Sequence, residues 1–210
     1  MSVRLDWDAM AAEAAAILTC PHCSSEAQDG MPQPPWVGAR YEPDGIVLVA
    51  QNPSSVRDLS KYERHLLQAL AEQPSAELLH EWSQHRIGYM TAKPWRQWKE
   101  GFQRAVGPCL APERTAWLNV VPYTTAANRA PSRRDRLDHL APLLELLQPR
   151  GVIARYEAAR RAVAATPGPW QAHPMVLPGM SVSRLDAWTV HQILHDHLGV
   201  PRHPSCAVAA

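Results

Sequence analysis

The chain has 210 residues, the size of one domain, and its 21 Lys and Arg against 20 Asp and Glu give a formal net charge of +1. Hydrophobic residues make up 46% of the sequence and charged residues 20%, which is enough for one sizeable core and excludes a chain that is disordered throughout. The near-zero charge also excludes a polybasic nucleic-acid tail, so any phosphate binding must come from local clusters.

Residues 1–45 are expected to form an N-terminal helix and a connector. The pattern predicts a helix over residues 8–19, a turn at the CPHC sequence of residues 20–23, and a connector rich in proline and glycine over residues 29–45. Acidic residues interrupt the apolar start, which argues against a secretory leader, and no apolar run is long enough for a membrane span. With only four cysteines, the chain is predicted to be cytoplasmic.

Residues 46–200 alternate between strand-like and helix-like patterns. Strands are predicted at 46–50, 116–121 and 151–154 and within 170–177, and helices at about 58–104 (broken near Pro74 and Pro94), 133–147, 157–165 and 185–198. Continuous apolar strands are typical of a parallel sheet covered on both faces. The sequence therefore predicts a single α/β domain, a three-layer α/β/α sandwich around a four-stranded, mainly parallel sheet, with a flexible tail at 201–210.

Polar residues at the predicted carboxyl ends of the strands are the candidates for chemistry, because ligands of such sheets bind at that edge. Gln51, Asn52 and Pro53 follow the first strand. Asn52 can orient a water but is a very poor base, and its alternative role is an Asx-turn or a helix N-cap. Asn119 lies in the second strand, where its carboxamide either ties two loops together or pairs with the edge of a base such as uracil.

A cationic segment follows the second strand. Arg129, Arg133 and Arg134 flank Ser132, which with Asp135 resembles a capping box at a helix start. Backbone amides at a helix start and nearby arginines can hold a phosphate. The alternative is a solvated cationic loop.

Two segments together resemble the uracil-DNA glycosylase superfamily. The run WLNVVPYTTAANRAPSRRDRLDHLAPLLELLQPRGVIA (117–154) is similar to the second motif region of the iron–sulfur branch. The run IVLVAQNPSS (46–55) is similar to the first motif, with Ala50 in place of the usual Gly. The resemblance covers about residues 46–185 and implies a monofunctional DNA repair glycosylase that flips uracil or another deaminated base out of DNA and hydrolyses its N-glycosidic bond.

The resemblance also implies roles for single residues. Asn119 would bind the flipped base, Asn52 would position the attacking water beside Gln51, and Tyr62 would stack on the base. The third motif is either His173-Pro174 or the turn at 178–184, and we favour the turn. The implied DNA contacts are Asn128, Arg129, Arg133, His173, Met180, Ser181, Val182 and Arg184.

The CPHC sequence matches the first half of the cluster site in the iron–sulfur branch. Cys20 and Cys23 hold the first two positions, but Tyr123 holds the third and the fourth falls close to Leu140. An iron–sulfur cluster is therefore not expected, and no cofactor is predicted. Zinc binding by Cys20 and Cys23 with Cys109 or a histidine is the alternative to a role in packing.

Other functions stay open at the level of the sequence. Ala50, Asn52 and a third motif without its histidine also fit a glycosylase-like protein that binds nucleic acid or a protein partner without catalysis. Hydrolysis of a free nucleoside or nucleotide is a third possibility. For a glycosylase, the missing carboxylate at Asn52 predicts slow turnover or a narrow preference for substrates with good leaving groups. The expected partner is DNA carrying a damaged or deaminated base, bound by a monomer that contacts no membrane.

Overall fold

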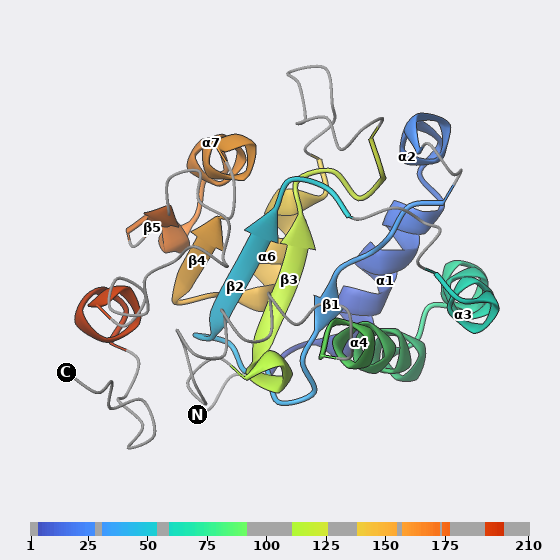
Figure 1. Ribbon diagram of the computed structural model, residues 1–210, viewed down its shortest axis with the longest axis horizontal. Coiled ribbons are helices and arrows are strands. Elements are labelled where there is room, and N and C mark those ends of the chain that lie inside the picture. Colours follow the sequence, from blue (N-terminus) through green and yellow to red (C-terminus); the bar gives the residue numbers. More distant parts are fainter. Residues whose placement is uncertain are drawn as a thin grey trace.

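Five strands form one mixed sheet in a computed structural model of the chain, so the fold is of the α/β class (Figure 1). The structure describes residues 4–27, 31–53, 59–91, 111–125, 138–154, 157–172, 174–176 and 192–199. The sheet order is β1-β3-β2-β4-β5, with β1 antiparallel to β3 and every other pair parallel. The strands are β1 (Trp36–Val37), β2 (Ile46–Ala50), β3 (Thr115–Asn119), β4 (Gly151–Ala154) and β5 (Pro174–Val176).

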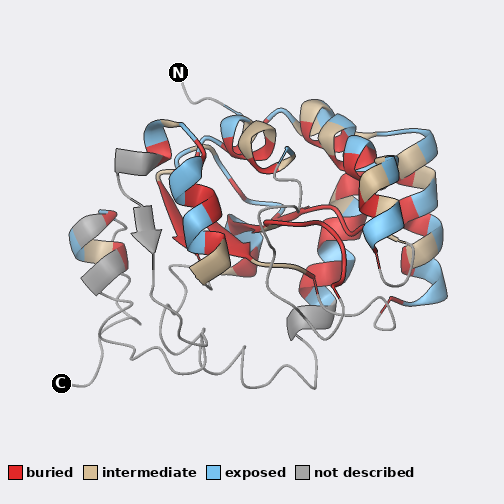
Figure 2. Ribbon diagram, turned by 90° about the horizontal axis from the view of Figure 1, so that it is seen from above, coloured by how far each residue is buried: buried red, intermediate tan, exposed pale blue. Residues whose placement is uncertain are grey.

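The helices surround the strands and turn their buried sides toward them (Figure 2). Helix α6 packs against β3, α7 against β4 and β5, and α4 against β1, while α1 packs against α3, α4 and α6. The described helices are α1 (Trp7–Leu18), α2 (Pro21–Glu26), α3 (Lys61–Glu72), α4 (Ala76–Thr91), α6 (Leu140–Leu147) and α7 (Glu157–Ala165), with 3-10 turns at Pro112–Arg114 and Pro169–Ala172 and a π-helical turn at Gln192–His197. None of the described helices is long and apolar enough to cross a membrane.

Strand β2 is the centre of the sheet, and all five of its residues are buried. Leu48 is in register with Trp117 of β3 on one side and with Ile153 of β4 on the other. A strand buried on both faces needs apolar side chains at every position, which explains why this segment does not alternate with polar residues. The pairing of β2 with β3 sets the position of the polar residues that follow both strands.

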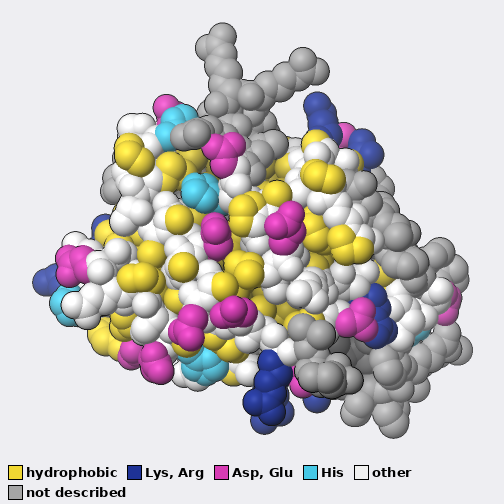
Figure 3. Space-filling view, turned by 180° about the vertical axis from the view of Figure 1, so that it is seen from behind, with side chains coloured by type: hydrophobic (Ala, Val, Ile, Leu, Met, Phe, Trp, Pro, Cys, Tyr) yellow, Lys and Arg dark blue, Asp and Glu magenta, His cyan; other side chains and the backbone are white. Residues whose placement is uncertain are grey.

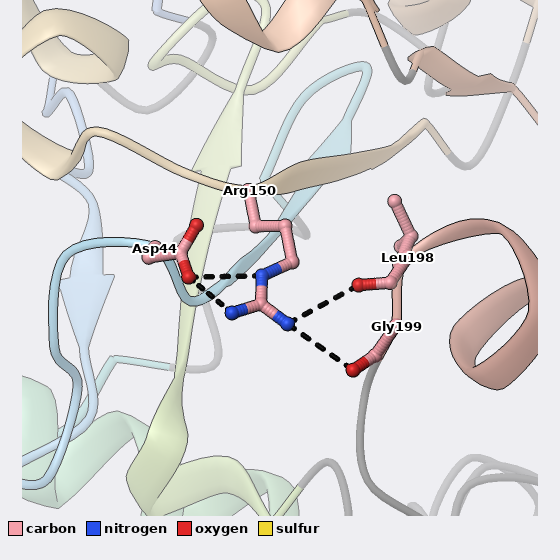
Figure 4. Close-up of polar contacts among 4 residues, drawn as sticks. All are labelled: Asp44, Arg150, Leu198 and Gly199. Carbon is pink, nitrogen blue, oxygen red and sulfur yellow. Dashed lines mark hydrogen bonds and ion pairs between the residues drawn. The ribbon is translucent and has the colours of Figure 1, made fainter.

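The amino-terminal edge of the sheet is held by Arg150 (Figure 4). This residue precedes β4, and its Nε donates a hydrogen bond of 2.9 Å to Asp44, which precedes β2; Nη2 also contacts this carboxylate. Its Nη1 donates to the carbonyl oxygens of Leu198 and Gly199, at 3.3 and 3.2 Å. One guanidinium therefore joins the starts of two strands to the C-terminal helical turn.

The predicted order of elements is largely confirmed, with three corrections. All four predicted strands exist, but the sheet has a fifth strand, β1. This strand was not predicted because it is only two residues long and lies in a connector rich in proline. The CPHC sequence is not a simple turn, because Cys20 is the N-cap of α2. The break predicted near Pro74 is present between α3 and α4, but α3 begins at Lys61, after the capping box formed by Ser60 and Glu63, rather than near residue 58.

Candidate functional site

The carboxyl ends of β2 and β3 bring Asn52 and Asn119 to the same edge of the sheet. Ala50 is in register with Asn119, and the ladder continues past the strands through hydrogen bonds from the Val120 amide to the Ala50 carbonyl (2.9 Å) and from the Val121 amide to the Gln51 carbonyl (3.1 Å). Both asparagines are half-buried. The expectation that these two carboxamides lie at one edge, neither of them deep in the interior, is therefore met.

The strand order also makes this edge a natural place for a ligand. From β2 the chain continues to β3, which lies on one side of β2, whereas β4 and then β5 are added on the other side of β2. The direction in which strands are added therefore changes between β2 and β4. Open α/β sheets bind ligands outside the carboxyl ends of the strands at such a switch point. Asn52 lies two residues beyond β2 at this position.

Thr125 holds the carboxamide of Asn52. The Nδ2 group of Asn52 donates a hydrogen bond of 3.0 Å to Oγ1 of Thr125, a buried residue on the segment that follows β3. This contact joins the two strand ends and fixes the plane of the amide. It uses the donor end of Asn52, so the carbonyl end, Oδ1, is the one suited to accept a hydrogen bond from a water or ligand.

Two buried polar atoms on the same segment have no partner within the described part of the chain. They are Oδ1 of Asn119 and Oγ1 of Thr124. Leaving a buried polar group unpaired costs about 1–3 kcal/mol, so native structures do so mainly where a ligand or water completes the site. Asn119 therefore presents an acceptor that is desolvated and ready for a hydrogen-bond donor.

The other predicted site residues near these strands have different surroundings. Pro53 is buried directly after Asn52, and Gln51 is half-buried with its carbonyl in the sheet ladder. Tyr62 lies in the first turn of α3 with 47% of its surface exposed. Within the described residues its contacts are with α4: its hydroxyl binds Glu81, and its ring lies 4.7 Å from that of His85. The structure does not bring Tyr62 into contact with either asparagine, and its stacking role stays a prediction.

The predicted DNA contacts and one candidate ligand fall outside the described residues, so their roles also stay predictions. They are Asn128, Arg129, Arg133, His173, Met180, Ser181, Val182, Arg184 and Cys109.

A group of possible metal ligands lies beside this edge. The Sγ atoms of Cys20 and Cys23 and a ring nitrogen of His139 all lie within 4.8 Å of one another. Helix α2, which begins at this CPHC sequence, also contacts the segment after β3, because the ring of His22 lies edge-on to that of Tyr123 at 6.3 Å. This group of possible ligands is thus a neighbour of the segment that carries Thr124 and Thr125.

These residues do not fit an iron–sulfur cluster of the kind found in the branch that the sequence resembles. Such a cluster is held by four cysteine thiolates. Tyr123 and Leu140, at the third and fourth positions, are each 1% exposed and pack in the core. The described residues supply two thiols and one imidazole instead.

Sequence reasoning missed Thr124, Thr125 and His139. Neither threonine carries a local signal, because Thr125 acts through a contact with Asn52 beyond the neighbouring strand and Thr124 stands out only by its buried hydroxyl. His139 lies next to Leu140, the position compared with the fourth cluster ligand, so its place in the sequence was the one available clue.

Comparison with known proteins gives no assignment for this chain. No protein-family model matches it, and no curated protein matches it either. The site must therefore be interpreted from its own chemistry. Its described part offers two carboxamides and two threonine hydroxyls at a sheet edge, a set suited to recognising a planar ligand with amide-like groups and to orienting a water.

Proposed function

We propose that the chain is a DNA repair glycosylase that hydrolyses the N-glycosidic bond of uracil or of another deaminated base. The observation that supports this function most is the pair of carboxamides on neighbouring strand ends, one fixed by Thr125 and the other with a desolvated acceptor. The resemblance of residues 46–55 and 117–154 to the motifs of uracil-DNA glycosylases agrees with this placement.

Asn119 has the groups needed to read the edge of uracil. Its Oδ1 would accept the N3–H hydrogen of the base, and its Nδ2 would donate to O4. Cytosine presents an acceptor at N3 and donors at N4, so it would face like groups on the same carboxamide and be rejected. Because the base edges are paired inside a duplex, the target base must first be flipped out of the stack.

Bond cleavage would need stabilisation of a leaving anion and one positioned water. As the bond from C1′ to N1 breaks, its electron pair stays on the base and positive charge develops on the sugar. Hydrogen bonds to O4, and to O2 from backbone amides near Gln51, stabilise the departing anion. A water held by Oδ1 of Asn52 then adds its oxygen to C1′, and its released proton ends on the base, which leaves an abasic sugar.

The overall layering and charge of the molecule are compatible with DNA binding at the carboxyl edge. We propose that α6, α7 and α4, which pack against different strands, belong to a three-layer α/β/α sandwich. On the back of the molecule, Asp and Glu side chains are scattered among hydrophobic ones and Lys and Arg lie mainly toward the rim (Figure 3). DNA phosphates would not be attracted to that face. Arg129 and Arg133, in the segment that follows Thr125, are the proposed phosphate contacts.

A glycosylase-like protein that only binds nucleic acid is the alternative. It is favoured by the lack of a general base among the described residues around the two asparagines. Asn52 cannot accept a proton, and no described carboxylate contacts Asn52 or Asn119. Loss of general-base assistance forfeits roughly 10²–10⁴ in rate, which would make a glycosylase slow rather than inactive.

The experiment is to measure abasic-site formation on single- and double-stranded oligonucleotides that contain uracil, hypoxanthine or xanthine. The wild type should produce abasic sites from at least uracil, and Asn119→Ala should slow this reaction by about 10²–10³, the usual cost of removing one donor to a developing anion. Ser83→Ala is the matched control, because Ser83 is buried on α4 and accepts a hydrogen bond of 3.0 Å from the Val37 amide, away from the strand ends.

Each outcome decides between the two functions. Equal rates for wild type and Asn119→Ala would remove Asn119 from base recognition. Tight binding of DNA without abasic product on any substrate would favour the binding protein. Equal losses in Asn119→Ala and Ser83→Ala would indicate general destabilisation and would contradict a specific role for Asn119.

A further inference from the structure

The group formed by Cys20, Cys23 and His139 joins two distant parts of the chain. Cys20 is the N-cap of α2, and Cys23 lies one turn further along that helix and is buried. His139 lies more than 100 residues later in the sequence, after β3 and immediately before α6. Their ligand atoms lie within 4.8 Å of one another, although neither local spacing nor sheet pairing requires His139 to be there.

The local structure of each residue suits a metal ligand. Sγ of Cys20 accepts a hydrogen bond of 3.3 Å from the Cys23 amide, a contact that stabilises a thiolate. Cys20 and Cys23 are not joined in a disulfide. His139 holds the N-cap position of α6, where Ser, Thr, Asp or Asn is preferred, yet its side chain makes no capping hydrogen bond. A residue that breaks a local preference in this way often serves a site instead.

The donor set and the spacing identify the metal. Two thiolates and one imidazole are typical ligands of Zn²⁺, which binds sulfur at about 2.3 Å and nitrogen at about 2.0–2.1 Å in a tetrahedron. These bond lengths place ligand atoms about 3.5–3.8 Å apart, so atoms that lie within 4.8 Å of one another need to move closer by at most about 1.3 Å. Hard cations such as Mg²⁺ and Ca²⁺ prefer oxygen ligands and do not match this set.

We propose that Cys20, Cys23 and His139 bind one zinc ion, with solvent as the fourth ligand. The ion fastens α2 to the start of α6. Because His22 of the same CPHC sequence packs against Tyr123, fixing α2 also supports the segment that carries Thr124 and Thr125. The proposal concerns metal binding alone and does not depend on the glycosylase activity.

The first test uses the wild-type chain and needs no variant. After reduction, loading with zinc and dialysis, elemental analysis should find one zinc per chain, and zinc should protect two thiols from alkylation by iodoacetamide. Replacement by Co²⁺ should give thiolate-to-cobalt charge-transfer bands and the visible bands of a tetrahedral ion. X-ray absorption at the zinc edge should show two sulfur and two nitrogen or oxygen neighbours.

The second test assigns the ligands. Cys20→Ser, Cys23→Ser and His139→Gln should each weaken zinc binding by more than the roughly 10–100-fold that loss of an outer-shell partner costs, and zinc should raise Tm less than in the wild type. The matched controls are Cys206→Ser, outside the described residues, and His65→Gln, on the exposed side of α3. Both should bind zinc as the wild type does.

Several results would overturn the proposal. They are a wild type that retains no zinc, three or four sulfur neighbours at the zinc edge, and ligand variants that bind zinc as tightly as the two controls. Iron and sulfide in the purified protein would indicate a cluster instead. A Cys20–Cys23 disulfide that forms readily in air, together with no zinc uptake by the reduced thiols, would indicate a redox pair.

Discussion

In the proposed glycosylase, Asn52 would occupy the place where a carboxylate is most useful. Its amide can hold a water through Oδ1 while Nδ2 binds Thr125, but it cannot take the proton of that water. An aspartate would keep the contact, since the hydroxyl of Thr125 can donate to a carboxylate as readily as it accepts from an amide. In the proposed glycosylase, the amide of Asn52 would therefore limit the rate, although the contact with Thr125 does not require an amide.

We predict that Asn52→Asp increases the single-turnover rate of uracil release by about 10²–10⁴, the usual contribution of a general base. The rate should also rise with pH as the new carboxyl group loses its proton. The measurement is abasic-site formation with enzyme in excess over a uracil-containing duplex. An unchanged or lower rate, in a variant that melts like the wild type, would remove Asn52 from the water site.

The same glycine-to-alanine change should have opposite effects at two positions. A Cβ atom on Gly38 would lie 2.4 Å from backbone atoms of Glu113 and Pro112, which cannot move without disturbing β1 and β3. A Cβ atom on Gly88, on an exposed side of α4, would meet no atom of the described residues within 4 Å apart from the nearby backbone of its own helix. Overpacking typically costs 1–3 kcal/mol, whereas replacing a helical glycine gains about 0.5–1 kcal/mol.

We therefore predict that Gly38→Ala lowers the free energy of unfolding by about 2 kcal/mol and that Gly88→Ala raises it by about 0.5–1 kcal/mol. Urea denaturation of the two variants checks the prediction. Two changes of the same sign would contradict the packing seen between β1 and the turn before β3.

At the scale of elements, Arg150 joins the starts of β2 and β4 to the C-terminal helical turn. It contacts Asp44 and the carbonyls of Leu198 and Gly199, but its side chain is 37% exposed and that of Asp44 is 63% exposed, so solvent weakens the ion pair. Arg150→Met should lower the free energy of unfolding by about 1 kcal/mol, mainly through the hydrogen bonds to the C-terminal turn. Arg161→Met, which removes a more exposed pair with Glu157, is the control and should cost less. Equal losses would contradict a joining role for Arg150.

Glu157 links the stability of α7 to pH. Its hydrogen bonds to Arg160 and then Arg161 hold the pKa of its carboxyl group at about 2, below the ordinary value of 4.5. A carboxyl group with a lowered folded-state pKa stabilises the fold above its unfolded-state pKa, and this contribution is lost as pH falls from 4.5 toward 2. Glu157→Gln should therefore melt below the wild type at neutral pH and approach it near pH 2. A constant difference in Tm across this range would contradict the assignment.

The elements that sequence patterns predicted well are those whose signal is local. The bounds of β2, β4 and α7 were correct because continuous apolar runs and a helix that starts at Glu157 are visible in a few residues. Strand β1 was missed because two residues, Trp36 and Val37, form a strand only by pairing with β3. The start of α2 was missed because a cysteine serves there as the N-cap.

At the scale of the whole molecule, the sequence could predict which polar residues lie at the sheet edge but not what they contact. Asn52 and Asn119 were predictable because they follow parallel strands, whose carboxyl ends share one edge. Thr125 and His139 were not, since each meets its partners only after distant segments pack together. A contact that depends on tertiary packing leaves no periodic pattern in the sequence.

The central claim is that Asn52 and Asn119 face one slot that holds a single base. The chain has three asparagines, so the side-chain amide signals of these two can be assigned in an ¹H–¹⁵N spectrum from their loss in Asn52→Asp and Asn119→Asp. The most direct test is to titrate the wild type with a duplex that carries uncleavable 2′-fluoro-2′-deoxyuridine, and with the same duplex carrying cytosine. We predict that both amide signals move together, with one Kd, only for the uracil duplex; movement of one signal alone, of neither, or of both with cytosine would contradict the shared slot.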